Sequence, residues 1–361
     1  MNWTRRALLK SSAATSAACC LGLSVPARPA WAADATITAV EWGGRYHENM
    51  QAASDTQDDI DVVWELHTGG AAAILAKIKS TWPSVNYDVV AAYSPVFASM
   101  IREDWVETVT AEQMPNLADI PDGLFMTDKA GNKKAIPRTT TALHWGYRRD
   151  LCPFEITKVE DLLDPRLAGQ IFFPAPVLNS NAQMISIARA LGGDENNMEP
   201  AWEFVAELAK SGNIGRVTTS GSDDFNTLST GETSVGFGAT SVFERVNAVV
   251  PQVEYLHKMP DESGFKSIIV MEGWAILKGG NTEAAMKWVN AMLSAEVNQA
   301  FNAGIGAVPS NLKANVAKEI ENVRFSQEEL ELYTYAPDWG FVSANLSEWA
   351  QRWEREIAPL L

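Results

Sequence analysis

Short apolar runs alternate with helix-like stretches along most of the chain, and this alternation is its strongest constraint on the fold. The run DVVWELH at 61–67 predicts a strand, and GAAAILAKIKS after Gly69 predicts a helix. A second apolar run ends at Tyr93, where Ser94 and Pro95 suit the N-cap and the first position of a helix. Strands that alternate with helices favour an α/β architecture with parallel sheets.

The same alternation continues in the second half of the chain. GQIFFPAP at 169–176 and SVGFGA at 234–239 predict strands, and NTEAAMKWVNAML at 281–293 has the apolar spacing of a helix. Capping boxes at Thr157–Glu160 and Ser241–Glu244 predict the starts of two further helices. No repeat or low-complexity linker separates two halves. We therefore expect lobes assembled from discontinuous segments, with the chain crossing between them more than once.

The first 32 residues are typical of a twin-arginine signal peptide rather than of a folded segment. Arg5 and Arg6 precede a moderately apolar stretch, and AWA at 30–32 supplies the small residues that a signal peptidase reads. No later apolar run is long enough to span a bilayer. We therefore expect a periplasmic protein that crosses the inner membrane by the twin-arginine route.

The charge of the mature chain excludes two classes of partner. Removing 1–32 leaves 25 of the 29 Lys and Arg residues against 45 Asp and Glu residues, a formal charge of −20. Such a charge repels nucleic acid and anionic lipid, so neither is an expected partner. Only Cys152 remains of the three cysteines, which excludes an intrachain disulfide. The length of the mature chain suggests two domains.

The residue types that carry common chemistries form no recognisable catalytic motif. The four histidines, His47, His67, His144 and His257, lack the spacing of an H-E-x-x-H zinc site. The sequence contains neither a G-x-S-x-G elbow nor a phosphate loop ending in Gly-Lys-Ser/Thr. We therefore expect no enzyme activity, no metal and no cofactor. A secreted enzyme on the same scaffold is the rival, because catalytic triads are spatial rather than sequential.

Four strand-to-helix turns are the candidate binding positions. In open α/β sheets, ligands bind at the carboxyl ends of strands, where helix N-termini present N–H groups. Trp42 offers a flat face to a solute, and Gly43 and Gly44 let the solute approach the backbone. The alternative is a core aromatic residue at a tight turn. The four turns are Trp42–Gly44, Tyr93–Ser94, Asn179–Asn181 and Ala239–Ser241.

An ordered set of motifs resembles one family of transport proteins. WGG, REDWVETV, MPNLADIP, VEDLLDPRLAGQI, STGETSVGFG and EGWAILKGGNTEAAMKWVNAML come in the order of that family. They resemble the extracellular solute-binding proteins of ABC importers, and within these the spermidine/putrescine-type branch. The resemblance covers nearly the whole mature chain.

The resemblance implies a two-lobed periplasmic-binding-protein fold of type II, with the solute in the cleft between the lobes. It implies that 34–138 and about 270–310 form lobe 1 and that 142–265 form lobe 2, with a C-terminal helical segment at 311–361 left unassigned. It also implies a monomer that closes on a small solute and delivers it to a membrane permease driven by a separate ATPase. A receptor that feeds a chemosensor remains an alternative.

Individual family positions leave two classes of solute open. Trp42 matches the first aromatic residue of the polyamine binders, and Glu272 matches an acid that binds an amine. Val270 and Ala239, however, stand where aromatic residues are expected, and FPAPVLNSN lacks two expected acids. A polyamine receptor is therefore the alternative rather than the first choice.

Several polar residues favour a small polar solute with an anionic group and, as an optional second group, an amine. Arg138, at the expected hinge, offers a guanidinium to a carboxylate or phosphate, or else pairs with an acid of the other lobe. The helices that start near Ser94 and Asn181 offer free N–H groups, although these residues suit helix caps too. Glu272 suits an amine or a salt bridge. The predicted ligand-binding residues are Trp42, Gly43, Gly44, Tyr93, Ser94, Arg138, Thr139, Asn179, Ser180, Asn181, Thr240, Ser241 and Glu272.

Overall fold

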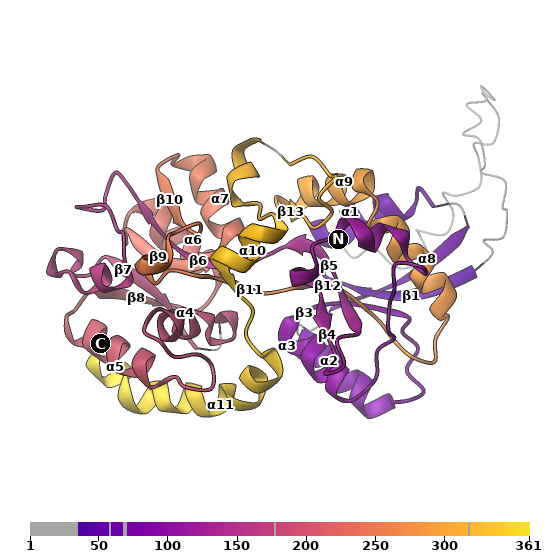
Figure 1. Ribbon diagram of the computed structural model, residues 1–361, viewed down its shortest axis with the longest axis horizontal. Coiled ribbons are helices and arrows are strands. Elements are labelled where there is room, and N and C mark those ends of the chain that lie inside the picture. Colours follow the sequence, from indigo (N-terminus) through magenta and orange to yellow (C-terminus); the bar gives the residue numbers. More distant parts are fainter. Residues whose placement is uncertain (1–34, 58, 68–70, 177, 317) are drawn as a thin grey trace, which may run out of the picture. The chain divides into compact units, whose positions relative to one another are not determined.

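The described part of the chain is an α/β structure with two separate sheets (Figure 1). The computed structural model describes residues 35–57, 59–67, 71–176, 178–316 and 318–361. These residues belong to one compact unit, Ala33–Leu361. The predicted signal peptide, 1–32, lies outside the described residues. The alternation of strands and helices confirms the predicted fold class.

The first sheet brings its strand ends to one edge. It consists of β1 (Ala35–Glu41), β2 (Ile60–Leu66), β3 (Val89–Tyr93), β4 (Met126–Thr127), β5 (Lys133–Thr140), β12 (Glu272–Ile276) and β13 (Val308–Pro309). The order is β13-β5-β12-β3-β1-β2, with β4 paired to β5. β1 is parallel to β2 and β3, whereas β12 is antiparallel to β3 and β5. The first residue of β12 therefore lies at the edge where β1, β3 and β5 end.

The second sheet has the same mixed character. It consists of β6 (Ala142–Arg148), β7 (Ile171–Pro174), β8 (Ile214–Thr218), β9 (Val235–Ala239), β10 (Val253–Leu256), β11 (Ser267–Ile269) and β14 (Thr334–Tyr335). The order is β14-β11-β6-β9-β7-β8, and β10 pairs with β6. β7 is parallel to β8 and β9, whereas β6 is antiparallel to β9. The ends of β7 and β9 therefore lie at the edge where β6 begins.

Helices cover both faces of the first sheet, which explains why its central strands are apolar on both sides. In β1, Ile37 and Ala39 pack into one core cluster and Val40 into another. The helices of the molecule are α1 (Arg45–Ser54), α2 (Ala71–Thr81), α3 (Ser94–Arg102), α4 (Ala182–Ala190), α5 (Glu199–Lys210), α6 (Gly221–Thr230), α7 (Thr240–Val249), α8 (Thr282–Met292), α9 (Ala295–Ile305), α10 (Gln327–Tyr333) and α11 (Trp339–Glu356). None of these described helices is long and apolar enough to cross a membrane.

In the described residues the chain crosses between the two sheets three times, the third time between β13 and β14. The first two crossing segments are hydrogen-bonded to each other. The chain leaves the first sheet after Thr140 and enters the second at Ala142; it returns between Ile269 and Glu272. Ile269 pairs with Ala142, and the amide of Val270 donates to the carbonyl of Thr141 at 3.2 Å. The two crossings therefore form one ribbon. The lobe boundaries inferred from the family resemblance remain a prediction.

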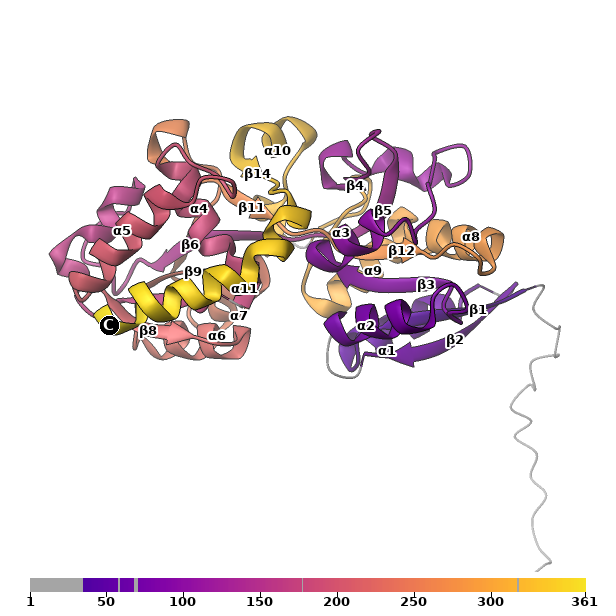
Figure 2. The same cartoon turned by 90° about the horizontal axis from the view of Figure 1, so that it is seen from below.

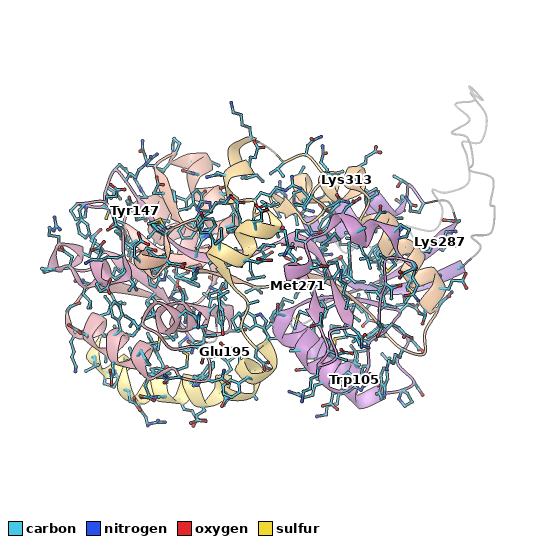
Figure 3. The ribbon with its side chains drawn as sticks, viewed as in Figure 1. Trp105, Tyr147, Glu195, Met271, Lys287 and Lys313 are labelled. Atoms are coloured by element: carbon cyan, nitrogen blue, oxygen red, sulfur yellow. The ribbon has the colours of Figure 1, made fainter. Side chains whose placement is uncertain are left out.

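The C-terminal segment joins the second sheet. β14 pairs with β11, and α11 runs along the side of the second sheet (Figure 2). Trp339, Trp349 and Trp353 of α11 belong to the core cluster of that sheet. Glu195, labelled in Figure 3, fixes the segment that precedes α11. Its carboxylate accepts hydrogen bonds from Tyr335 Oη at 2.6 Å and from the amide of Asp338 at 2.7 Å.

Three predicted helix caps are wrong in detail. The N-cap of α3 is Tyr93, and Ser94 Oγ instead accepts a hydrogen bond from the amide of Met271 at 2.7 Å. The N-cap of α7 is Ala239, without a side-chain cap bond, so the Ser241–Glu244 box does not form. The box expected at Thr157–Glu160 is replaced by Asp161, whose carboxylate accepts from the amide of Thr157 at 2.8 Å. The helix starts one residue earlier than predicted in α3 and two residues earlier in α7.

Gly273 lies where β12 approaches β5 most closely. A Cβ atom added to Gly273 would lie 1.9 Å from the carbonyl oxygen of Ile136, which is backbone and has no room to move. We expect Gly273→Ala to lower the free energy of unfolding by more than about 3 kcal/mol, measured by urea denaturation. The control is Gly43→Ala, because an added Cβ there meets no atom within 4 Å in the described structure. Equal stability of the two variants would contradict this packing.

His144, on β6, is a buried histidine with an exposed fraction of 1%. Among the described residues, neither nitrogen of its ring has a hydrogen-bond partner. The ring stacks on Phe243 of α7 with a centroid distance of 5.2 Å and lies 5.8 Å from the ring of His257. Burial, followed by the charge of His257, holds the pKa of His144 well below its usual value. The folded protein therefore keeps this ring neutral.

A neutral buried His144 predicts a loss of stability in acid. Below about pH 6.5 the unfolded chain takes up a proton that the folded chain cannot, so stability falls as the pH falls. Between pH 7 and pH 5 we expect His144 to account for about 2 kcal/mol of that loss. Urea denaturation at both pH values should show a smaller loss for His144→Leu than for the wild type. The same pH dependence in both proteins would refute the assignment.

Candidate functional site

Four predicted residues meet at the edge of the first sheet. Glu272, the first residue of β12, pairs with Tyr93 at the end of β3 and with Thr139 near the end of β5. Trp42 follows the end of β1, which lies next to β3. Strand direction therefore gathers these side chains; the strand-end argument had named Trp42 and Tyr93, and the family resemblance had named Glu272. Their roles in binding remain predictions.

Trp42 belongs to an aromatic stack. Its ring stacks with His67 at a centroid distance of 4.0 Å and with Tyr93 at 6.1 Å. His67 follows β2 and Tyr93 ends β3, on opposite sides of β1, so Trp42 lies between them. His67 Nε2 lies 2.8 Å from the carbonyl oxygen of Ala91, which fixes that ring. Sequence reasoning missed His67, whose only signal was its place directly after a strand.

The glycines after Trp42 form an open turn. Gly44 adopts a positive φ of 64° and is the N-cap of α1. In the described structure, an added Cβ at Gly43 or Gly44 would meet no atom within 4 Å. This turn therefore leaves its backbone open to approach.

Arg138 is buried between two carboxylates rather than open to a solute. Its exposed fraction is 0%. Nη1 and Nη2 donate to the two carboxylate oxygens of Glu41 at 2.5 and 3.0 Å. Nε and Nη2 donate to Oε1 of Glu272 at 3.1 and 2.8 Å. Both acids belong to the same sheet as Arg138, so the arginine forms salt bridges within that sheet, and its contact with a solute anion remains a prediction.

Aromatic rings and amides complete the surroundings of Arg138. The guanidinium lies 4.8 Å from the ring centroid of Phe301 and 5.3 Å from that of Tyr46. Asn298 and Asn302 of α9 donate to its backbone carbonyl at 2.8 and 3.0 Å. Burial alone would lower the pKa of Arg138. The charges of Glu41 and Glu272 outweigh this effect and hold the pKa above its usual value, so the guanidinium stays charged.

One arginine cannot neutralise two carboxylates, so this group keeps a net charge of −1 when both acids are ionised. Burial raises the pKa of Glu272, while Arg138 opposes that shift. Oε2 of Glu272 is 3.4 Å from the hydroxyl of Tyr46, which donates to it. Burial, followed by the charge of Glu272, raises the pKa of Tyr46 well above its usual value, so this hydroxyl remains a donor. Glu41 was missed because it closes a strand that reads as an apolar run.

A small cavity of about 60 Å³ lies beside Glu272. Glu272 and Tyr46 line it from the first sheet and α1, and Thr240 and Ser241 line it from the start of α7. It thus joins three predicted ligand-binding residues from both sheets. Thr139 is buried nearby, and its hydroxyl pairs with that of Thr141 at 2.8 Å.

A larger cavity of about 980 Å³ lies against the same crossing segment. Met271, labelled in Figure 3, lines it, whereas Glu272 lines the small cavity. Successive side chains of an extended chain point to opposite faces, so the two cavities lie on opposite sides of the segment. Ser94 is the predicted binding residue that lines the larger one, together with Phe125, Trp339 and Phe341. Its volume is in the range of small-molecule sites.

The turn at Asn179–Asn181 has an unusual backbone. Asn179, Ser180 and Asn181 have successive positive φ angles of 58°, 52° and 64°. Asn181 is the N-cap of α4 and has an exposed fraction of 0%, and among the described residues its amide nitrogen has no partner. Non-glycine residues held in this region are found where the surrounding structure requires them, often at functional sites. The turn lines neither of the two cavities described above.

The chain belongs to the family of bacterial extracellular solute-binding proteins, whose model matches residues 46–324. A spermidine/putrescine-binding periplasmic protein of Haemophilus influenzae is 26% identical over 259 residues, 68% of each chain. The predicted family is therefore confirmed.

Solved structures share the fold. An extracellular solute-binding protein of Bordetella parapertussis, described as putative in its name, has a TM-score of 0.75 at 21% identity, over 90% of this chain and 99% of its own. An ABC transporter protein of Clostridium perfringens has a TM-score of 0.74 at 20% identity, over 89% and 99%. A spermidine/putrescine ABC transporter substrate-binding protein of Streptococcus pneumoniae has 0.71 at 17%, over 88% and 99%. The two-lobed fold of such proteins is confirmed for this chain.

The buried charge group predicts a specific stability defect. Arg138→Leu leaves two buried carboxylates without a cation, so we expect the free energy of unfolding to fall by about 3–5 kcal/mol at pH 7. Buried carboxylates that lack a cation take up protons more readily, so the defect should shrink as the pH falls towards about 4.3, the usual value for Glu. Urea denaturation at pH 7 and pH 4 measures both effects.

A triple variant provides the control for Arg138→Leu. Adding Glu41→Gln and Glu272→Gln removes the unpaired charges, and we expect it to restore most of the lost stability at pH 7. A triple variant as unstable as Arg138→Leu would show that packing, not charge, causes the defect.

Proposed function

We propose that this chain is the periplasmic receptor of an ABC importer, which binds a small polar solute between its lobes and delivers it to a membrane permease with a separate ATPase. The family match and the names of its relatives support this role. Export by a twin-arginine signal at 1–32, a monomeric state and closure of the lobes on the solute belong to the same proposal. The proposed lobes are 34–138 with about 270–310, and 142–265.

The carboxylate of Glu272 is the observation from which we infer the charged group of the solute. Its Oε1 takes both bonds from Arg138, while Oε2 faces Tyr46 at 3.4 Å on the wall of the small cavity. When both acids are ionised the charge of the group is −1, which favours a cation. We therefore assign an amine to the solute as its main charged group, in place of the anion expected at Arg138. The donors of Arg138 are already taken by Glu41 and Glu272.

The anionic end of the solute, where it has one, is assigned to the start of α4. The buried amide nitrogen of Asn181, which has no partner among the described residues, is a hydrogen-bond donor at a helix N-terminus, and both features favour an oxygen acceptor. The turn lines neither cavity, so this contact requires the closure of the lobes that belongs to the same proposal.

A polyamine receptor is the second candidate. The relative from Haemophilus influenzae carries that name, and Trp339 and Phe341 give the larger cavity an aromatic lining that suits a methylene chain. Val270 and Ala239 still lack the aromatic rings expected of a polyamine binder.

A thermal-shift screen of residues 33–361 tests the function. The panel holds amino acids, betaines, polyamines, small carboxylates, phosphonates and sugars. A ligand at about 100 times its dissociation constant adds roughly 2.7 kcal/mol of stability, which raises the melting temperature measurably. We expect an amine-bearing solute to raise the melting temperature and Glu272→Gln to abolish the increase.

Phe341→Ala is the matched control, because it changes only the larger cavity and its side chain is exposed by 36%. It should leave the increase intact. Loss of the increase in Phe341→Ala, with none in Glu272→Gln, would place the solute in the larger cavity. An increase produced only by anionic solutes would overturn the amine assignment.

A further inference from the structure

Glu41 accepts hydrogen bonds from Arg138 with both of its carboxylate oxygens, whereas Glu272 uses only one. Both carboxylate oxygens of Glu41 accept from the guanidinium, at 2.5 and 3.0 Å, which is the bidentate arrangement of a strong arginine pair. Only Oε1 of Glu272 accepts from Arg138. The charge of the arginine is thus used mainly by an acid that is itself buried, with an exposed fraction of 1%.

We propose that Glu41 is a specificity-determining residue of the solute site. Because Glu41 shares the single positive charge of Arg138, the negative charge of Glu272 is only partly neutralised, and this remaining charge selects a cationic group. This inference rests on the proposed function. Glu41 acts through Arg138 and Glu272 and is a positioning residue. Without Glu41, the arginine and Glu272 would form a neutral pair, and the site would lose its preference for a cation over a neutral group of the same shape.

The walls of the small cavity carry the same sign of charge. Glu272 and Glu244 are the charged residues among those that line it, and no basic side chain is among the described lining residues. The hydroxyl of Tyr255 donates to Glu244, which holds that acid on the α7 side. Arg138, the base that forms a salt bridge with Glu272, also forms one with Glu41. The charge of the site therefore depends on how Arg138 is shared.

Glu41 also fixes the turn that carries Trp42. The amide of Trp42 donates to Oε1 of Glu41 at 2.7 Å, the same oxygen that accepts from Nη2 of Arg138. One carboxylate thus sets both the aromatic stack and the charge of Glu272. A test has to separate the two effects, because a change at Glu41 alters both.

Two variants separate charge from shape. Glu41→Gln keeps the size of the side chain and an acceptor oxygen for the amide of Trp42, but removes the charge. Glu41→Asp keeps the charge and shortens the side chain. If Glu41 has only a structural role, Glu41→Asp should impair solute binding more than Glu41→Gln. The proposal predicts instead that Glu41→Gln weakens the preference for a cationic solute more than Glu41→Asp does.

The first measurement needs no solute. Carbon-13 NMR of labelled glutamate carboxyls, with Glu272→Gln to assign the signal, follows the titration of Glu272 in each protein. We expect Glu41→Gln to lower the pKa of Glu272 by at least about one unit, since a like charge is removed and Arg138 turns to Glu272. Glu41→Asp should leave it near the wild-type value. An unchanged pKa of Glu272 in Glu41→Gln overturns the proposal, whatever the solute is.

The second measurement uses putrescine and 1,4-butanediol, which have equal length and differ in charge. Calorimetry should show the affinity ratio of diamine to diol falling at least about tenfold in Glu41→Gln and much less in Glu41→Asp. A ratio unchanged in Glu41→Gln overturns the proposal. Wild-type protein that binds neither probe counts against the assigned amine solute of the proposed function, and the titration of Glu272 still decides the role of Glu41.

Discussion

The sharing of Arg138 between Glu41 and Glu272 is the interaction on which the rest of the site depends. It ties β1, β5 and β12 together at one edge of the first sheet, and the rings of Phe301, Tyr46 and Trp274 surround the guanidinium. Removing charges from water is costly, and such a group is stable only when each donor has a partner. Arg138 donates four hydrogen bonds to Glu41 and Glu272, and Glu272 also lines the small cavity. The side chains that hold this edge of the sheet together are therefore those to which the proposed function assigns the solute.

The gathering of strand ends explains why this position suits a receptor. Antiparallel β12 brings its first residue to the edge where parallel strands finish, and the crossing ribbon starts there. A side chain at this edge is held by the sheet and also lies next to the segment that connects the two sheets. A solute bound at such a place contacts the part of the chain on which any closure must act.

The sequence was most informative where the physics is local. Alternating apolar runs and helical spacing predicted the α/β class, and the strand-end argument selected Trp42 and Tyr93, which lie at one edge. Glu272, at the same edge, was selected by the family resemblance. The sequence could not show that Arg138 pairs with Glu41, because these residues are 97 positions apart and only the order β5-β12-β3-β1 brings them together. The position of α11 was open for the same reason, since an amphipathic helix does not reveal which core its tryptophans enter. The predicted cap at Ser94 was wrong because the hydroxyl bonds to Met271, 177 positions away.

Met271 and Glu272 are neighbours in the crossing segment and form part of the walls of two different cavities. The hydroxyl of Ser94 fixes the backbone of Met271, because it accepts from the amide and donates to the carbonyl of that residue. A molecule that displaces the wall from one side changes the space available on the other. By thermodynamic linkage, whatever effect an occupant of the larger cavity has on affinity in the smaller one is matched by an equal effect in return. The segment is thus a wall that both cavities share.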